Sequence, residues 1–244
     1  MTKQKTTKSS IFQFKQFALN QEKCSMKIGT DGVLLGAWVN CEEKKEILDI
    51  GCGTGLIGIM LGQRNKKGHI DGIEIQNEAF DEANENMNLA PWSDRLHCIS
   101  GAIQEYSRAS YKKYDLIVSN PPFFTGGTFS DQAGRDTARH TIKLPHGDLI
   151  FSIRRLLAKD GTFALILPYM EGLRFMELAE RADLHVQRIT EVFPKASLAI
   201  NRLMIEFGWE KKDAPLPTQL VIREEDNSYT EAYIELTKDF YLKF

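Results

Sequence analysis

Residues 47–59 read Ile-Leu-Asp-Ile-Gly-Cys-Gly-Thr-Gly-Leu-Ile-Gly-Ile. An apolar run leads into closely spaced glycines, and a second apolar run follows them. This order predicts a buried strand, a tight turn and a helix, which together begin an open α/β sheet. Glycines let a backbone approach a ligand closely, and the N-terminus of the following helix leaves free N–H groups there. The segment therefore predicts both a fold class and a ligand site.

The class of ligand depends on the acids near this turn. Gly53, Gly55 and Gly58 satisfy the G-x-G-x-x-G spacing of dinucleotide-binding proteins. Glu74 ends the next expected strand, where an acid that grips a ribose is expected. Nicotinamide dinucleotides and S-adenosylmethionine (SAM) both fit these features. Asp49 favours SAM, because a carboxylate inside the strand would repel a pyrophosphate but not a sulfonium or an ammonium group.

A second motif follows the expected strand 114–119. It reads Asn120-Pro121-Pro122-Phe123, and two consecutive prolines end strand pairing and stiffen the turn. The Asn120 side-chain oxygen and the Pro121 carbonyl would converge from this rigid edge, with the Phe123 ring beside them. Two acceptors and a ring suit a planar amine that carries two N–H donors, as in a nucleobase or an amide. The alternative is an ordinary turn that the asparagine caps.

Strands and helices alternate from residue 46 onward, which is typical of a parallel sheet covered on both faces. We expect strands at 46–50, 69–75, 95–100, 114–119 and 162–167, and helices at 55–63, 77–88, 102–107, 146–157 and 170–183. Apolar runs at 186–193 and 198–209 predict an antiparallel pair, followed by a strand at 219–223 and a helix at 229–240.

The prediction is an α/β, Rossmann-like fold with a seven-stranded, mostly parallel sheet and a C-terminal antiparallel strand pair. We expect one domain, 1–244, made of an N-terminal arm and lid (1–45) and a core (46–244). Ligands of such sheets bind outside the carboxyl ends of the strands. The glycine turn, Glu74 and Asn120 should therefore share one crevice.

Composition excludes several classes of protein. The 244 residues are 42% hydrophobic and 26% charged, with a net charge of −2. No apolar run approaches the ~20 residues that cross a bilayer. The first ten residues are basic but lack the apolar stretch of a signal peptide. Four scattered cysteines form no C-x-x-C pair, which argues against a zinc knuckle or a disulfide framework. We expect a cytoplasmic, metal-free monomer.

Basic residues cluster locally although the net charge is slightly negative. The candidates for contact with RNA are Lys27, Arg135, Arg139, His140 and Lys143. Such side chains would bind phosphates and position an RNA without reading its sequence. A solvated surface with incidental charge is the alternative for each of them.

A family resemblance rests on longer stretches. These are Phe14-Lys15-Gln16-Phe17, residues 24–38 from Cys-Ser-Met-Lys-Ile-Gly-Thr-Asp-Gly to Trp38, residues 135–140, Tyr229-Thr230 and Phe240-Tyr241. With them the chain resembles, over essentially its full length, the bacterial tRNA1(Val) adenine-37 N6-methyltransferase family. This is a family of class I SAM-dependent methyltransferases, here with an Asn-Pro-Pro-Phe motif.

The resemblance implies a cofactor site for SAM. Residues Asp49, Gly51, Gly53 and Gly55 would cradle its methionine end, and Glu74 would hold the ribose hydroxyls. Thr30 and Asp31 would help to close the cofactor pocket, next to Asn120. Many relatives carry an acid after the third strand that contacts the SAM adenine. Here that stretch reads Ser100-Gly101-Ala102-Ile103, so a backbone N–H such as that of Ala102 would have to serve.

The resemblance also implies the substrate, which is the N6 amine of adenosine 37 in the anticodon loop of a valine tRNA. Asn120 and Pro121 would hold that amine, and Phe123, a tyrosine in many relatives, would stack on the base. The alternatives are the guanine-N2 amine of ribosomal RNA and the glutamine-N5 amide of a release factor. DNA adenine methylation is disfavoured because no target-recognition domain is visible. A non-catalytic SAM-binding module is a further alternative.

Overall fold

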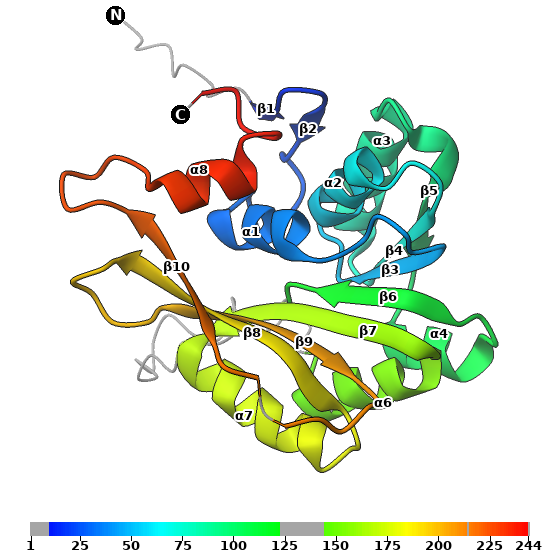
Figure 1. The fold of residues 1–244 in the computed structure, drawn as a ribbon. Helices are drawn as coiled ribbons and strands as arrows, with labels where there is room; N and C mark the ends of the chain where they lie inside the picture. The colour runs from blue at the N-terminus through cyan, green and yellow to red at the C-terminus, as the bar shows by residue number, and fades with distance from the viewer. Residues whose placement is uncertain (1–9, 123–143, 214, 244) are drawn as a thin grey trace, which may run out of the picture.

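A computed structural model describes residues 10–122, 144–213 and 215–243. An eight-stranded sheet in the order β10-β8-β9-β7-β6-β3-β4-β5 forms its centre (Figure 1). The strands are β3 (Glu46–Ile50), β4 (His69–Glu74), β5 (Leu96–Ser100), β6 (Tyr114–Ser119), β7 (Leu157–Pro168), β8 (His185–Lys195), β9 (Arg202–Gly208) and β10 (Thr218–Arg223). The five strands β3 to β7 run parallel, and β9 lies antiparallel between β7 and β8.

The α/β class, the mostly parallel sheet and the antiparallel C-terminal pair are confirmed. The sheet has one strand more than the predicted seven, because β10 pairs parallel with the outer edge of β8. Strand β7 is also longer than the predicted 162–167. It begins at Leu157, which pairs with Tyr114 before the register shifts between Tyr114 and Leu116.

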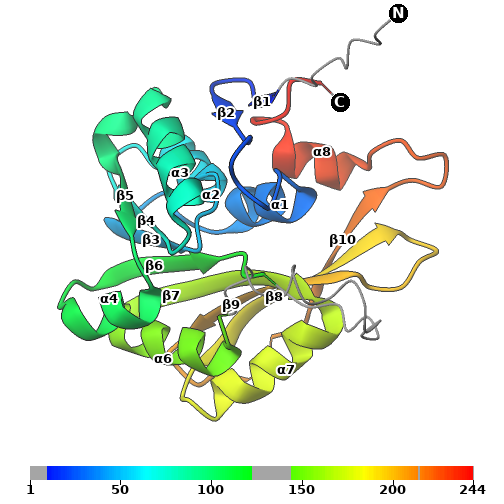
Figure 2. The same ribbon diagram turned by 180° about the vertical axis from the view of Figure 1, so that it is seen from behind.

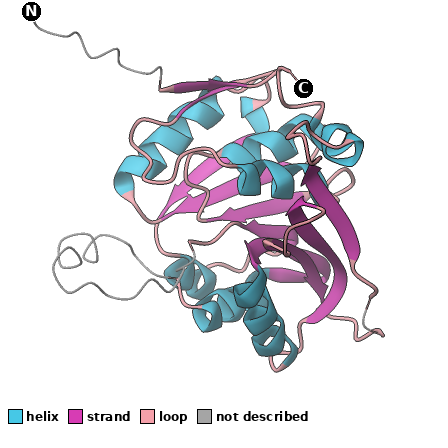
Figure 3. Cartoon of the chain, turned by 90° about the vertical axis from the view of Figure 1, so that its left-hand side faces the viewer, coloured by secondary structure: helices cyan, strands magenta, loops and turns pink. Residues whose placement is uncertain are grey.

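Helices cover both faces of the sheet (Figures 1, 2 and 3). They are α1 (Thr30–Trp38), α2 (Leu56–Arg64), α3 (Asn77–Leu89), α4 (Ile103–Ala109), α6 (His146–Leu156), α7 (Tyr169–Glu180) and α8 (Glu231–Thr237), with a 3-10 turn at Ser93–Arg95. Side chains of a strand alternate between the faces. Ile47 thus joins the core beneath α1 and α2, whereas Leu48 joins the core against α6 and α7.

The N-terminal arm lies against the C-terminal end of the chain. It begins with a short antiparallel hairpin of β1 (Ile11–Gln13) and β2 (Ala18–Asn20). The Lys15 N–H donates to the Phe240 carbonyl at 2.8 Å, and the Phe14 ring stacks on that of Tyr241. The arm then runs through residues 21–29 to α1. In the part of the chain that the structure describes, no helix is long and apolar enough to cross a membrane.

Candidate active site

Four loops meet at the carboxyl edge of the sheet. The glycine loop follows β3, Glu74 ends β4, Gly101 follows β5, and Asn120 follows β6. Strands β5, β4, β3 and β6 are direct neighbours in the sheet, so these loops lie side by side. The predicted convergence of the glycine turn, Glu74 and Asn120 on one edge is therefore present.

The backbone of the glycine loop adopts a conformation that residues other than glycine rarely adopt. Gly51, Gly53 and Gly55 have φ angles of 70°, 57° and 81°, which lie in the left-handed region. The loop is tied to β4 because the Gly51 N–H donates to the Ile73 carbonyl at 2.9 Å. Nothing lies within 4 Å of the place that a Cβ would take on Gly51. The loop therefore leaves room above its backbone for a bound group.

Asp49 lies beneath this loop and is 1% exposed. Its Oδ2 atom accepts a hydrogen bond from the Gly58 N–H at 3.1 Å, which holds the first turn of α2 against β3. Its Oδ1 atom is buried and has no hydrogen-bond partner among the described residues. Burial raises the pKa of this carboxyl to about 7, and the charge of Glu74 acts in the same direction. A direct contact of Asp49 with a cofactor stays a prediction.

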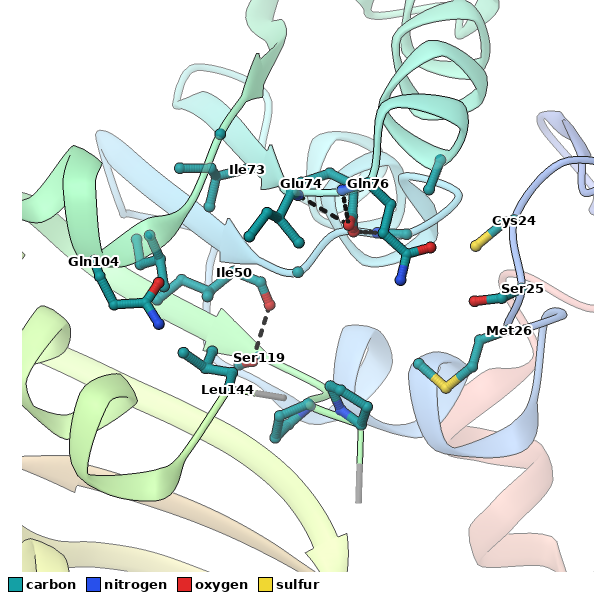
Figure 4. Close-up of a pocket in the computed structure, with 18 residues that line it drawn as sticks. Cys24, Ser25, Met26, Ile50, Ile73, Glu74, Gln76, Gln104, Ser119 and Leu144 are labelled. Atoms are coloured by element: carbon teal, nitrogen blue, oxygen red, sulfur yellow. Dashed lines mark hydrogen bonds between the residues drawn. The ribbon is translucent and has the colours of Figure 1, made fainter. Parts of the chain in front are cut away.

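Glu74 organises the backbone around it (Figure 4). Its Oε2 atom accepts a hydrogen bond from the Gly53 N–H at 3.0 Å, and Oε1 accepts from the N–H groups of Ile75 and Gln76 at 2.9 and 3.0 Å. A carboxylate has about four lone-pair sites, so these three bonds leave capacity for a ligand hydroxyl. Glu74 therefore links the glycine loop to the start of α3 and can still accept from a ribose.

A first pocket opens between these loops and encloses about 920 Å³, part of it open to solvent. Apolar side chains from the ends of β3, β4 and α4 form its walls, and Glu74 supplies its acid. Its lining is Cys24, Ser25, Met26, Ile50, Gly51, Gly53, Ile73, Glu74, Ile75, Gln76, Ala79, Gly101, Ile103, Gln104, Ser119, Pro121, Pro122 and Leu144.

A second pocket adjoins the first and shares Cys24, Met26, Gly51 and Gly53 with it. The N-terminal turn of α1, with Thr30 and Asp31, forms one wall. Asn120 forms another, and residues from the C-terminal half of the chain complete the lining. These are Val192, Pro194, Asn201, Arg202 and Ile222. The two pockets therefore meet at the glycine loop, with Glu74 on one side and Asn120 on the other.

Two residues that line the second pocket form an ion pair. The Arg202 Nε atom donates to Asp31 Oδ2 at 2.8 Å, and Nη1 of Arg202 donates to the side-chain oxygen of Asn201. Strand β9 is antiparallel to β7, so its first residue, Arg202, lies at the carboxyl edge beside Pro168. Sequence analysis missed Asn201 and Arg202, because their only local signal is a polar pair at the start of an apolar run.

The remaining predicted residues differ in their outcome. Pro121 is buried and Pro122 is exposed, and both line the first pocket. Ala102 does not line it, whereas its neighbours Gly101 and Ile103 do. Lys27 donates to the carbonyls of Gln21, Glu22 and Cys24, so its described contacts hold the arm together. Its contact with RNA stays a prediction.

Five predicted residues lie outside the part of the chain that the structure describes. They are Phe123, Arg135, Arg139, His140 and Lys143. Among the residues that are described, no group of three or more His, Cys, Asp or Glu side chains could hold a metal ion.

The sequence matches known methyltransferases. Residues 25–166 match the model of the "Methyltransferase small domain" family. A protein of Flavobacterium psychrophilum named "tRNA1(Val) (adenine(37)-N6)-methyltransferase" is 41% identical over 96% of this chain and 100% of its own length. One of Trichodesmium erythraeum with the same name is 43% identical over 96% of this chain and 98% of its own length.

The chain belongs to the tRNA1(Val) (adenine(37)-N6)-methyltransferase family. A solved structure shares its fold, the crystal structure of a predicted O-methyltransferase from Agrobacterium tumefaciens. It superposes with a TM-score of 0.69 at 16% identity and covers 86% of this chain and 96% of that one. A putative RNA methyltransferase from Pyrococcus horikoshii covers 72% and 80%, with a TM-score of 0.51 and 17% identity. The methyltransferase fold is therefore shown by sequence and by structure.

Proposed function

We propose that this protein transfers the methyl group of SAM to the N6 amine of adenosine 37 in the anticodon loop of tRNA1(Val). The observation that carries the proposal is the meeting of two pockets at the glycine loop, one with Glu74 and one with Asn120. Methyl transfer needs a cofactor and an acceptor side by side, and this arrangement provides for both. The names of the relatives supply the identity of the acceptor.

SAM fits the first pocket. The space above Gly51 would take its methionine end, and Glu74 would accept hydrogen bonds from its ribose hydroxyls. Ile50, Ile73 and Ile103 offer apolar walls for a flat adenine. When bound, SAM supplies an electrophilic methyl group on a sulfonium, and the protein supplies binding and orientation. The positive charge of bound SAM would favour the ionised form of the buried Asp49 carboxyl beneath the site.

The target amine would enter the second pocket. The N6 nitrogen of adenine is a weak nucleophile, because its lone pair is delocalised into the ring. The Asn120 side-chain oxygen and the Pro121 carbonyl would accept its two N–H bonds and favour a more pyramidal nitrogen. They would also aim the lone pair at the methyl group for an in-line displacement. The methylated nitrogen would then lose its extra proton to water. The rate would then come from alignment and from dipoles placed where charge develops.

An anticodon loop is a suitable source of this base. A base must leave its stack to enter a pocket, at a cost of a few kcal/mol that a loop nucleotide largely avoids. Phe123 would stack on the base, and Lys27, Arg135, Arg139, His140 and Lys143 would contact phosphates. Residues 1–45 would act as an arm and lid on a single methyltransferase domain. Such an enzyme would work in the cytoplasm as a monomer without a metal.

The test is methyl transfer from labelled SAM to bulk tRNA taken from a strain that lacks the activity. Nucleoside mass spectrometry of separated tRNAs then identifies the product. We expect N6-methyladenosine in one valine tRNA alone. Label in N2-methylguanosine of ribosomal RNA, or in a release factor, would overturn the proposed substrate while retaining the cofactor. Binding of SAM without any transfer would overturn the catalytic role.

A further inference from the structure

Residues 20–28 of the arm are fastened to the core by two side chains of α3, Glu82 and Asn86. Both side chains are buried, at 0% and 1% exposure. They lie four residues apart and therefore share one face of the helix. Among the described residues, they are the only hydrogen-bond partners that residues 20–28 have outside the arm. Neither of them lines the first or the second pocket.

Asn86 joins the arm to the glycine loop. Its Oδ1 atom accepts a hydrogen bond from the Asn20 N–H at 2.9 Å, and its Nδ2 atom donates to the Asn20 carbonyl at 2.8 Å. The same Nδ2 atom donates to the Thr54 carbonyl at 2.9 Å. A side-chain amide has two N–H donors, so one residue can hold both segments. Asn86 therefore fixes the arm relative to the loop that follows β3.

Glu82 holds the next part of the arm. Its Oε2 atom accepts hydrogen bonds from the N–H groups of Lys23 and Cys24, at 2.5 and 2.8 Å. Its Oε1 atom is buried and has no hydrogen-bond partner among the described residues. Burial of a carboxyl group costs stability unless the group is hydrogen-bonded. A carboxyl with one such oxygen, whose other oxygen binds only the arm, is better suited to positioning the arm than to stabilising the helix.

The turn formed by residues 21–28 is held together by its own side chains. The Lys27 ammonium donates to three backbone carbonyls within this turn. The Ile28 N–H donates to the Gln21 side-chain oxygen at 2.9 Å. The turn therefore behaves as one unit, and its bonds to α3 determine where that unit lies.

This unit forms a wall that the two pockets share. We call Cys24, Ser25 and Met26 the arm wall. All three line the first pocket, and Figure 4 shows them along one side of it. Cys24 and Met26 also line the second pocket. The Cys24 Sγ atom lies 3.5 Å from the place that a Cβ would take on Gly53, so the arm wall rests on the glycine loop. A displaced arm would open the junction of the two pockets.

We propose that Glu82 and Asn86 are positioning residues, which hold the arm wall against the glycine loop and thereby set the affinity for SAM. The proposal rests on the proposed function, because it takes the first pocket as the cofactor site. Neither side chain would touch the cofactor or the reacting amine. The apparent Kd of a ligand rises as the binding-competent state becomes less populated. An arm wall that is in place for only part of the time would therefore weaken SAM binding.

The test compares Asn86→Ala with Asn65→Ala. Asn65 is 0% exposed. Its side chain also joins two backbone segments, 41–44 and 67–68, neither of which lines the first or the second pocket. Both variants should lower Tm, because each leaves buried backbone groups unpaired. Only Asn86→Ala should raise the Kd of SAM, about tenfold if the arm wall is then in place about a tenth of the time. Isothermal titration well below both Tm values measures this Kd.

Kinetics and hydrogen exchange separate positioning from a general loss of stability. Asn86→Ala should raise KM for SAM with little change in kcat, because saturating cofactor restores the arm wall. In the protein without ligand, the amides of residues 20–26 should exchange faster in Asn86→Ala than in the wild type. Asn65→Ala should leave both KM for SAM and this exchange unchanged.

Two variants of Glu82 provide an independent comparison. Glu82→Gln keeps a side-chain oxygen that can accept from the arm, so it should raise the Kd of SAM less than Glu82→Ala does. An unchanged Kd in Asn86→Ala, an equal rise in Asn65→Ala, or equal rises in the two Glu82 variants would overturn the proposal. Wild-type protein that binds SAM but methylates no tRNA would instead overturn the proposed function, and the Kd of SAM would still test the arm wall.

Discussion

The two pockets are built in different ways. The first is centred on one local segment, since its glycine loop, Glu74 and Gln76 fall within 26 consecutive residues, 51–76, and backbone N–H groups of this segment donate to the Glu74 carboxylate. The second is assembled from distant parts of the chain, and its ion pair joins residues 171 positions apart. This difference indicates that the two pockets have different roles. The local half suits a cofactor common to many enzymes, and the assembled half suits an acceptor that distinguishes this family.

The largest effect should come from Asn120→Ala. Removal of one of the two acceptors for the amine should lower kcat by about 10²–10³-fold, as for loss of a group aimed at developing charge. Affinity for SAM should be nearly unchanged, because Asn120 lines the second pocket and not the first. Single-turnover methyl transfer measures the first quantity. Asn120→Asp keeps an acceptor oxygen and is the matched control, so it should lose less activity. Near-normal turnover of the alanine variant would show that the second pocket does not hold the amine.

The next effect is the pH dependence of stability through Asp49. Its pKa of about 7 is raised from 3.8 by burial, so between these values the folded protein binds the proton more tightly than the unfolded chain. The free energy of unfolding therefore falls as the pH rises through this interval. Relative to Asp49→Asn, the wild-type protein should lose roughly 2–3 kcal/mol between about pH 5 and pH 8.

Urea unfolding at several pH values measures this difference. Asp160→Asn, at an exposed position, is the control and should show no comparable change. A difference between wild type and Asp49→Asn that is constant with pH would contradict the buried, protonated carboxyl beneath the glycine loop.

A smaller effect is expected for Gly55→Ala. Gly55 has a φ of 81°, and an added Cβ would lie 3.4 Å from two side-chain atoms of Met87. The left-handed conformation costs an L-residue about 1–2 kcal/mol, which corresponds to a fall in Tm of a few degrees for a chain of this size. Gly147→Ala is the control, because its Cβ would meet nothing within 4 Å in the first turn of α6. Calorimetry should show no fall in Tm for Gly147→Ala. An equal fall in Tm for both variants would contradict the left-handed conformation of Gly55.

The smallest effect belongs to the ion pair between Asp31 and Arg202. Both side chains are about a fifth exposed, at 23% and 21%, so solvent screens the pair and a coupling energy of about 0.5–1 kcal/mol is expected. Asp31→Asn and Arg202→Gln should each lower kcat/KM for tRNA about two- to fivefold. The double variant should lose little more than either single one. If Asp31→Asn instead lowered the affinity for SAM, Asp31 would belong to the cofactor pocket, as the family resemblance implies.

The parts of the site at the ends of β3, β4 and β6 could be predicted from sequence because each signal is confined to a few residues. Glycines after an apolar run, an acid at the end of the next strand and an Asn-Pro-Pro turn each fix their own backbone. The parallel order of the strands then brings them to one edge. The structure confirms this placement for Gly51, Glu74 and Asn120.

The assembled half could not be predicted in the same way. Strand 219–223 was expected, but nothing local specifies that it joins the outer edge of β8. Arg202 was read as part of an apolar strand, because its partner Asp31 lies in the other half of the chain. Such pairings depend on tertiary contacts that a local pattern does not contain.

Titration of SAM into two variants most directly tests the assignment of the cofactor to the first pocket and the acceptor to the second. Glu74→Gln removes one of the oxygens that hold the glycine loop and face the first pocket, and Asn120→Ala alters only the second pocket. Isothermal titration should show SAM bound about 10- to 100-fold more weakly by the first variant, a loss of about 1.4–2.7 kcal/mol. The second variant should bind SAM as the wild type does. Weak binding by Asn120→Ala together with normal binding by Glu74→Gln would contradict the assignment of the two pockets.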